Sequence, residues 1–124
     1  MRNDRPNIIV DQSLEFALMV ITYCEILEER RKFVVSHQLL KAGTSIGANI
    51  REAQNAESKT DFIHKMKIAA KEADETLYWI TLCEMSKNYP PPLNLKEKLQ
   101  NIHNVISKII ATSKAQIQNR HDQL

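Results

Sequence analysis

The chain has 124 residues but only two glycines, Gly43 and Gly47, which stand four apart in a run that otherwise has the character of a helix. Glycine destabilises a helix interior by roughly 1 kcal/mol relative to alanine, so two glycines on one face need a physical reason. The usual reason is the close approach of a second helix. Because Ala42, Ser45 and Ala48 lie alongside, the pattern predicts a flank of small side chains on which a neighbouring helix packs tightly. The alternative is a flank left bare for a ligand or a partner.

The periodicity of apolar residues predicts four helices separated by short breaks. The expected helices cover residues 11–32, 36–56, 58–87 and 94–117. Pro90, Pro91 and Pro92 end the third, because three consecutive prolines cannot continue a helix. Such short connections make each helix fold back on its predecessor. The sequence therefore predicts an all-α, up-down-up-down four-helix bundle, as one domain over residues 1–124.

Three of the expected helices begin with side chains that suit an N-terminal cap. Asp11 is the expected cap of the first helix, and Asn94 is that of the fourth. Ser58 and Asp61 form a capping box at the third, in which Ser58 accepts from a first-turn amide while Asp61 reaches back.

Several classes of protein are disfavoured by the sequence. The longest apolar run, Phe16 to Ile21, is far shorter than the roughly 20 residues of a membrane span. Met1–Pro6 has no apolar stretch of the signal-peptide type, so we expect a cytoplasmic protein without a membrane partner. Cys24 and Cys83 each lie in an apolar helical stretch and are expected to be reduced packing residues.

The sequence offers no constellation of catalytic residues. A di-metal site in a helix bundle needs the spacing Glu-x-x-His, which is absent from the chain, and its four histidines are scattered. Glycine-rich phosphate loops, a nucleophile elbow and a His-Glu-x-x-His pair are also absent. The acidic pair Glu72 and Glu75 is more typical of a solvated helix surface than of catalysis. We therefore expect a non-enzymatic protein without a catalytic residue, a metal or a cofactor.

Charge is spread unevenly along the chain, although the net charge is only +2. Residues 1–29 hold two basic and six acidic side chains, residues 30–71 hold nine basic and three acidic, and residues 72–124 hold six of each. A basic middle third favours an anionic partner, and the alternative is a set of solvated lysines on helix surfaces.

Lysines in the third helix have the spacing of a basic face. Lys67 and Lys71 follow His64 at i+3 and i+7, and the second helix adds further cations. Cations on adjacent helices can neutralise phosphates without reading bases. The candidate residues for binding RNA or DNA are Lys41, Arg51, Lys65, Lys67 and Lys71.

Two of the expected helices have a second apolar side, which indicates a homo-oligomer. The first helix has Leu14, Ala17, Leu18 and Ile21 opposite its core side. In the third helix the corresponding residues are Ile68, Trp79 and Leu82, with Trp79 as the expected anchor of a subunit interface. The alternative is that long side chains of the same subunit cover Trp79. Asn49, beside the glycines, is expected to be partly buried and to bond to the first or third helix.

Three stretches resemble the four-helix-bundle family of 23S ribosomal RNA intervening-sequence proteins. They are Gln38-Leu-Leu-Lys-Ala-Gly-Thr-Ser-Ile-Gly-Ala-Asn-Ile-Arg-Glu-Ala53, Asp61-Phe-Ile-His-Lys-Met-Lys-Ile-Ala69 and Lys71-Glu-Ala-Asp-Glu-Thr-Leu-Tyr-Trp-Ile80. The run from Ala42 to Asn49 is the most specific part. Lys41 stands where many members carry arginine, which keeps the charge but loses bidentate phosphate geometry.

This resemblance implies a subunit that assembles into a ring-like homopentamer, encoded in some bacteria within an insertion in the large ribosomal RNA gene. It also implies kinship with the accessory variability protein of diversity-generating retroelements, a basic pentamer thought to engage nucleic acid and a reverse transcriptase. A shared fold alone does not show that this chain has either role. The leading hypothesis is an oligomer that binds RNA or DNA through the backbone, and the alternative is an oligomeric scaffold for another protein.

Overall fold

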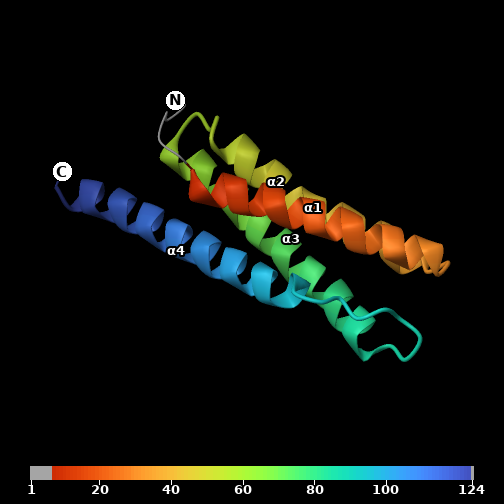
Figure 1. Cartoon of the computed structure of the whole chain (residues 1–124). Coiled ribbons are helices and arrows are strands. Elements are labelled where there is room, and N and C mark those ends of the chain that lie inside the picture. The colour runs from red at the N-terminus through yellow and green to blue at the C-terminus, as the bar shows by residue number, and fades with distance from the viewer. Residues whose placement is uncertain (1–6, 124) are drawn as a thin grey trace.

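The computed structural model describes residues 7–123, which form four helices and no strand. The helices are α1 (Ile8–Glu29), α2 (Phe33–Ala53), α3 (Lys59–Met85) and α4 (Leu95–Asp122). Successive helices run in opposite directions, which is the up-down-up-down order (Figure 1). The expected all-α, four-helix class is confirmed. Met1–Pro6, on which the expectation about a leader rests, lie outside the described residues.

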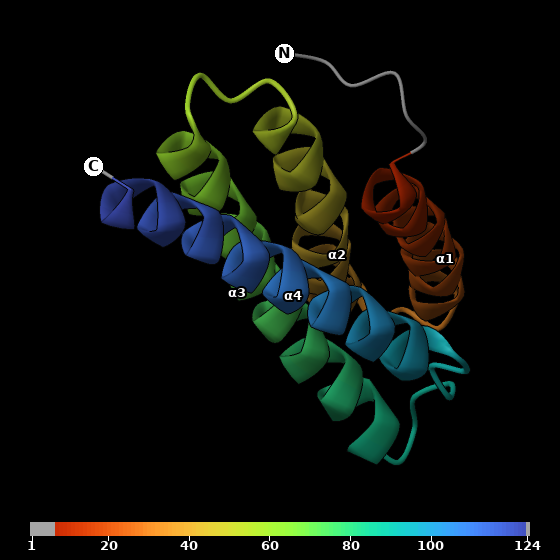
Figure 2. The same ribbon diagram turned by 90° about the vertical axis from the view of Figure 1, so that its left-hand side faces the viewer.

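Helix α2 packs against both α1 and α3, while α4 packs mainly on α3 and less extensively on α1. Figure 2 shows α4 crossing α3 obliquely. The core takes one apolar stripe from every helix. Its largest fully buried side chains include Phe16, Leu27, Leu39, Ile46, Ile50, Met66, Ile80, Leu99, Ile102 and Ile106. None of the described helices is long and apolar enough to cross a membrane.

The helix ends differ in part from the sequence expectations. Helix α1 begins one turn earlier than predicted, with Asn7 at its N-cap position, so Asp11 lies in the first turn instead of capping it. Ser58 Oγ accepts from the Asp61 amide at 3.0 Å, as predicted, but Asp61 Oδ2 accepts from Glu57 N and not from Ser58. Asn94 makes no side-chain cap bond.

The last helix is longer than expected. Helix α4 continues to Asp122 instead of fraying after Ile117, and its last turn carries Arg120 and His121. Cations at a helix C-terminus interact favourably with the helix dipole. Gln116 already lies beside Lys59, the first residue of α3, so the additional residues of α4 lie at the end of the bundle where α3 begins (Figure 1).

The two glycines lie where α1 comes close to α2. A Cβ atom on Gly43 would stand 2.9 Å from Cγ2 of Val20, a fully buried side chain. At Gly47 it would stand 3.3 Å from Oγ and 3.4 Å from the backbone oxygen of Ser13. The stiff, β-branched Val20 has little freedom to move away. Helix α1 therefore fills the space that a side chain at position 43 would need.

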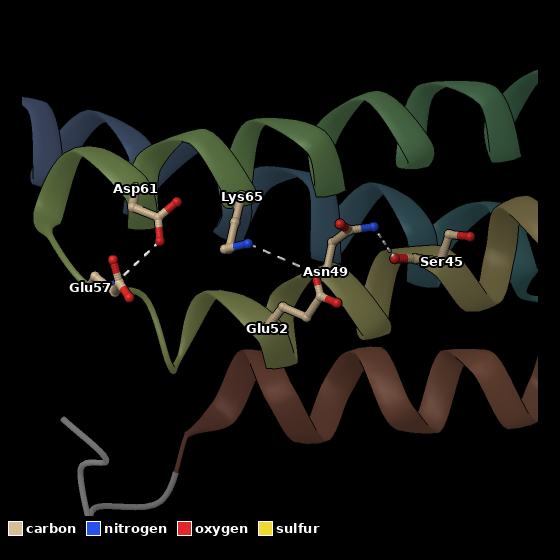
Figure 3. A network of polar contacts seen from close by, with 6 residues as sticks. All are labelled: Ser45, Asn49, Glu52, Glu57, Asp61 and Lys65. Carbon is tan, nitrogen blue, oxygen red and sulfur yellow. Dashed lines mark hydrogen bonds and ion pairs between the residues drawn. The ribbon is translucent and has the colours of Figure 1, made fainter.

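Asn49 is half-buried, but its hydrogen bond differs from the expected one. Its Nδ2 donates to the backbone oxygen of Ser45 at 2.8 Å, within α2 itself (Figure 3). The prediction of a partner on the first or third helix was wrong, because an asparagine within a helix can reach the carbonyl one turn earlier.

Buried side chains form hydrogen bonds between segments at the end of the bundle where α1 connects to α2. Ser36 Oγ donates to the backbone oxygen of Cys24 at 3.2 Å, and Cys24 Sγ donates back to that of Ser36 at 3.4 Å. Tyr23 donates its hydroxyl proton to the backbone oxygen of Pro90 at 2.6 Å. These bonds join α1 to α2 and to the connection between α3 and α4. Cys24 and Cys83 are both free and buried.

The glycine contact yields a test of stability. We expect Gly43→Ala to lower the free energy of unfolding by about 1–3 kcal/mol, because the new methyl group overlaps Val20. Gly47→Ala should cost less than about 1 kcal/mol, since better helix propensity offsets a smaller shift of Ser13. Urea unfolding measures both values. In a Val20→Ala background the penalty of Gly43→Ala should shrink. An equal penalty in both backgrounds would contradict the contact.

The buried thiols and phenol yield a test of pH dependence. Burial raises the pKa of Cys24 from 9.0 to about 11, and it also raises the pKa values of Cys83 and Tyr23. Above pH 9 the unfolded chain loses thiol protons that the folded chain keeps, so the folded state binds more protons and its stability falls as pH rises. We expect the free energy of unfolding to decline from about pH 9 upward, and less steeply in Cys24→Ala. Equal slopes in the two proteins would contradict this.

Candidate nucleic-acid interface

The five predicted cations do not share one face. Lys67 and Lys71 lie one turn apart on an exposed side of α3. Lys65 lies on the side of α3 that packs against α2, where its Nζ is 4.0 Å from Oε2 of Glu52 (Figure 3). An opposite charge at that distance partly neutralises Lys65. The structure therefore keeps Lys67 and Lys71 together and separates Lys65 from them.

The candidate Arg51 on α2 lies apart from this pair. Arg51 lines a shallow groove of about 160 Å³ between α1 and α2, together with Val10 and Leu14. Lys41 is exposed on α2. Arg51 faces the α1 side of the molecule, so it does not join Lys67 and Lys71 on one surface of the subunit.

The seam between α3 and α4 shows which cations do come together. The two helices are antiparallel, and four pairs of side chains meet along them. Lys96 contacts Glu84 at 3.1 Å, His103 contacts Asp74 at 3.3 Å, and Lys59 donates to Gln116 at 2.7 Å. Between these favourable pairs, Lys67 meets Lys114. Three contacts along the seam are attractive, and this one is repulsive.

The contact between Lys67 and Lys114 changes the pKa of Lys114. The Lys67 ammonium lowers the pKa of Lys114 by charge repulsion, although Lys114 is exposed to water. Within residues 7–123, Lys67, Lys71 and Lys114 have no carboxylate at ion-pair distance. Like charges held side by side without an acidic partner repel one another, and an anion between them would relieve that repulsion.

The same side of the molecule carries further cations toward the start of α3. Lys59, Gln116 and Arg120 line an open hollow of about 420 Å³ between α3 and the last turns of α4. Lys67, Lys71 and Lys114 lie further along the same two helices. We group these three lysines with the two cations of the hollow. We call this group the α3–α4 basic flank, and its residues are Lys59, Lys67, Lys71, Lys114 and Arg120.

Sequence reasoning did not include Lys114 or Arg120 among the candidates. Both lie in α4, and their neighbours depend on the register between α4 and α3. The signal that could have found them is the antiparallel register, in which the attractive pairs from Glu84 to Lys59 align the two helices. Extending that register places Lys114 beside Lys67.

The residues predicted for a subunit interface are only partly covered. Ile68 and Leu82 are half-buried and lie outside the core cluster of the described residues. Trp79 is half-buried but packs against the core, and its ring meets that of Tyr78 edge to face at 5.4 Å. Its Nε1 is buried without a hydrogen-bond partner in residues 7–123. Much of the indole surface is therefore used within its own subunit.

The exposed apolar residues of α1 give a stronger signal than Trp79. Leu14 is 51% exposed, Leu18 is 57% exposed and Ile21 is 38% exposed. They follow one another at helical spacing, so they form a single stripe on the outer side of α1. The predicted second apolar side of the first helix is present.

Comparisons with known proteins agree on one family. The family model for the 23S rRNA-intervening sequence protein matches residues 5–112. A crystal structure of a protein of unknown function from the S23 ribosomal protein family of Bacteroides thetaiotaomicron is similar, with 40% sequence identity and a TM-score of 0.78. That alignment covers 82% of this chain and 97% of the other. Among curated proteins, none matches the sequence.

The lysine contact predicts that small polyanions stabilise the fold. Inorganic tripolyphosphate should raise the melting temperature by several degrees at low salt, because it relieves the repulsion between Lys67 and Lys114 and binds only the folded chain. Lys114→Gln should reduce that rise. The matched control is Lys108→Gln, which removes one charge from α4 away from the seam and should leave the rise unchanged. Equal shifts in both variants, measured by thermal unfolding, would contradict an anion site at the contact.

Proposed function

Because the chain belongs to the family of 23S rRNA-intervening sequence proteins and gathers unpaired cations along α3 and α4, we propose that it is a non-enzymatic protein that binds the backbone of RNA or DNA. The observation that carries the proposal is the proximity of Lys67 to Lys114, in a seam where the other polar contacts of residues 7–123 are favourable. A nucleic-acid backbone supplies the negative charge that is missing beside Lys67 and Lys114. The proposed compartment is the cytoplasm.

The α3–α4 basic flank suits phosphates better than bases. Its cations come from two antiparallel helices and are spread along them, and a nucleic-acid strand likewise presents charges at many points along its length. The flank itself contains lysine and arginine but no aromatic side chain on which a base could stack. Binding through such a surface is strong at low salt and poorly selective for sequence.

We propose further that the protein acts as a homo-oligomer, a homopentamer as the family resemblance implies. The exposed stripe of Leu14, Leu18 and Ile21 supports self-association, because single chains rarely leave such apolar rows in water. Each subunit of an oligomer would present its own basic flank. Several flanks on one particle raise the affinity for a long strand without any new contact.

A second candidate function rests on the same stripe. An exposed apolar surface can also dock another protein, in which case the oligomer is a scaffold and nucleic acid is irrelevant. A reverse transcriptase is one such partner that the resemblance implies. Binding that persists well above physiological salt would favour this scaffold, because phosphate contacts weaken steeply there.

The nucleic-acid proposal is tested by charge reversal on the flank. We expect Lys67→Glu with Lys114→Glu to weaken binding to RNA and DNA of any sequence by at least tenfold, because two phosphate contacts become repulsive. In a plot of the logarithm of the binding constant against the logarithm of the salt concentration, the magnitude of the slope should decrease by about 2. Fluorescence anisotropy with a labelled 20-nucleotide RNA and a DNA duplex measures both quantities across a salt series.

The matched control has the same change of net charge on other surfaces. Lys87→Glu with Lys108→Glu reverses one cation in the connection after α3 and one on α4 outside the flank. This control should bind nearly as well as the wild type. Equal losses in the two double variants would mean that net charge alone matters, and would remove the flank from the proposal.

A further inference from the structure

Lys67 and Lys114 are neighbouring cations on two helices, and both are exposed to water. One turn before and after Lys67, α3 carries Ile63, His64, Ala70 and Lys71. One turn before and after Lys114, α4 carries Ile110, Ala111, Ile117 and Gln118. None of these neighbours is a carboxylate, so neither helix supplies a negative charge next to the pair.

The nearest carboxylates along α3 lie on other sides or have partners of their own. Asp61 accepts a hydrogen bond from a backbone amide just before α3. Asp74 contacts His103 at 3.3 Å. Glu72 follows Lys67 by five residues, so it lies about 140° around the helix from it. These carboxylates do not form an ion pair with Lys67.

Carboxylates of the other elements are also remote from Lys114. Asp122 lies about two turns further along α4 and accepts a hydrogen bond from Gln118 at 3.1 Å. Glu15 of α1 meets α4 at Lys98, and Lys114 lies about four turns beyond that contact. Within residues 7–123, the charged group beside the Lys114 ammonium is therefore a second cation.

A cation beside a lysine amine makes that amine more reactive at a given pH. The charge of Lys67 lowers the pKa of Lys114, so a larger fraction of the Lys114 amine is neutral. Only the neutral amine has the lone pair that attacks a carbonyl carbon, and lysines next to another cation are activated in this way. Lys67, while charged, attracts an anion to the same place. The pair therefore suits an electrophile that carries negative charge.

We propose that Lys114 is a modification site whose amine is acylated by small acyl phosphates, such as acetyl phosphate, while Lys67 holds the phosphate group of the donor. The Lys114 nitrogen attacks the carbonyl carbon, and an N–C bond forms. The C–O bond to phosphate breaks, inorganic phosphate leaves with the electron pair, and the nitrogen releases a proton to water. The product is an uncharged amide. Lys67 does not react and is a positioning residue.

The modification changes the charge of the α3–α4 basic flank. Acylation removes the positive charge of Lys114 and with it the repulsion from Lys67. Under the proposed function, on which this consequence rests, the modified flank binds a phosphate backbone more weakly. The concentration of acyl phosphate then regulates nucleic-acid binding. The reaction at Lys114 itself does not depend on that function, so the two can be tested separately.

The experiment compares two lysines of α4 within the same molecule. Lys108 is exposed and also has no carboxylate one turn away, but it lies on a different side of α4 from Lys114. The folded protein is incubated with acetyl phosphate, the remaining amines are capped with deuterated acetic anhydride after unfolding, and mass spectrometry gives the acetylated fraction at each lysine. We expect Lys114 to react at least about threefold faster than Lys108. Because both rates come from one sample, decay of the donor affects them equally.

Variants at Lys67 test its role as a positioning residue. Lys67→Arg keeps the charge and should keep the preference for Lys114, whereas Lys67→Gln should bring the rate at Lys114 close to that at Lys108. In the wild type, the ratio of the two rates should fall as the pH rises from about 7 to 10, because both amines become neutral at high pH. Lys67→Gln should show a much smaller fall. Circular dichroism verifies that each variant is folded.

The outcomes separate this inference from the proposed function. Equal rates at Lys114 and Lys108, faster acylation of Lys67, or a preference that survives in Lys67→Gln would overturn the modification site. Single-stranded RNA at low salt should slow acylation of Lys114 and leave that of Lys108 unchanged. If RNA changes neither rate while Lys114 keeps its preference and its dependence on Lys67, the modification site stands and the placement of nucleic acid on the flank is overturned.

Discussion

The close contact between α1 and α2 determines how the remaining surfaces are arranged. At Gly43 the two helices are so near that Val20 fills the volume of a missing side chain. Helix α1 therefore uses one side for α2 and an adjacent side, with Phe16 and Leu27, for the core. Leu18 lies nearly opposite Phe16 on the helix, so it faces neither partner and stays exposed. The packing of α1 on α2 thus determines that the side with the apolar stripe stays exposed.

The seam between α3 and α4 shows a different constraint. Exposed ion pairs contribute little individually, typically about 0–1 kcal/mol, so the ion pair of Glu84 with Lys96 and the polar contact of Asp74 with His103 mainly favour one register. In that register Lys67 and Lys114 are neighbours. A single carboxylate at either position would turn repulsion into attraction at no cost to packing. Local rules are broken most often at functional sites, which is why this contact and not the total charge supports an anionic partner.

Much of the fold could be predicted from the sequence because helix periodicity and chain breaks are local properties. The four helices, the Ser58 cap and the small residues around Gly43 are all local signals. The predictions that failed depend on contacts between distant residues, or on a choice between two hydrogen-bond partners close by in the chain. Asn49 bonds within its own helix, and Asn7 replaces Asp11 as the N-cap residue. The candidate site was half predicted, because Lys67 and Lys71 share a helix whereas Lys114 comes from another.

The proposed self-association and the α3–α4 basic flank are related through charge. A free subunit is nearly neutral, because the carboxylates of α1 offset cations elsewhere on the chain. Lys67, Lys71 and Lys114 of the flank have no carboxylate at ion-pair distance within residues 7–123. In the proposed oligomer each subunit repeats this flank, so one particle presents several groups of cations to the same strand. Assembly would therefore raise the affinity for a phosphate backbone through multivalency, without a change in the net charge of each chain.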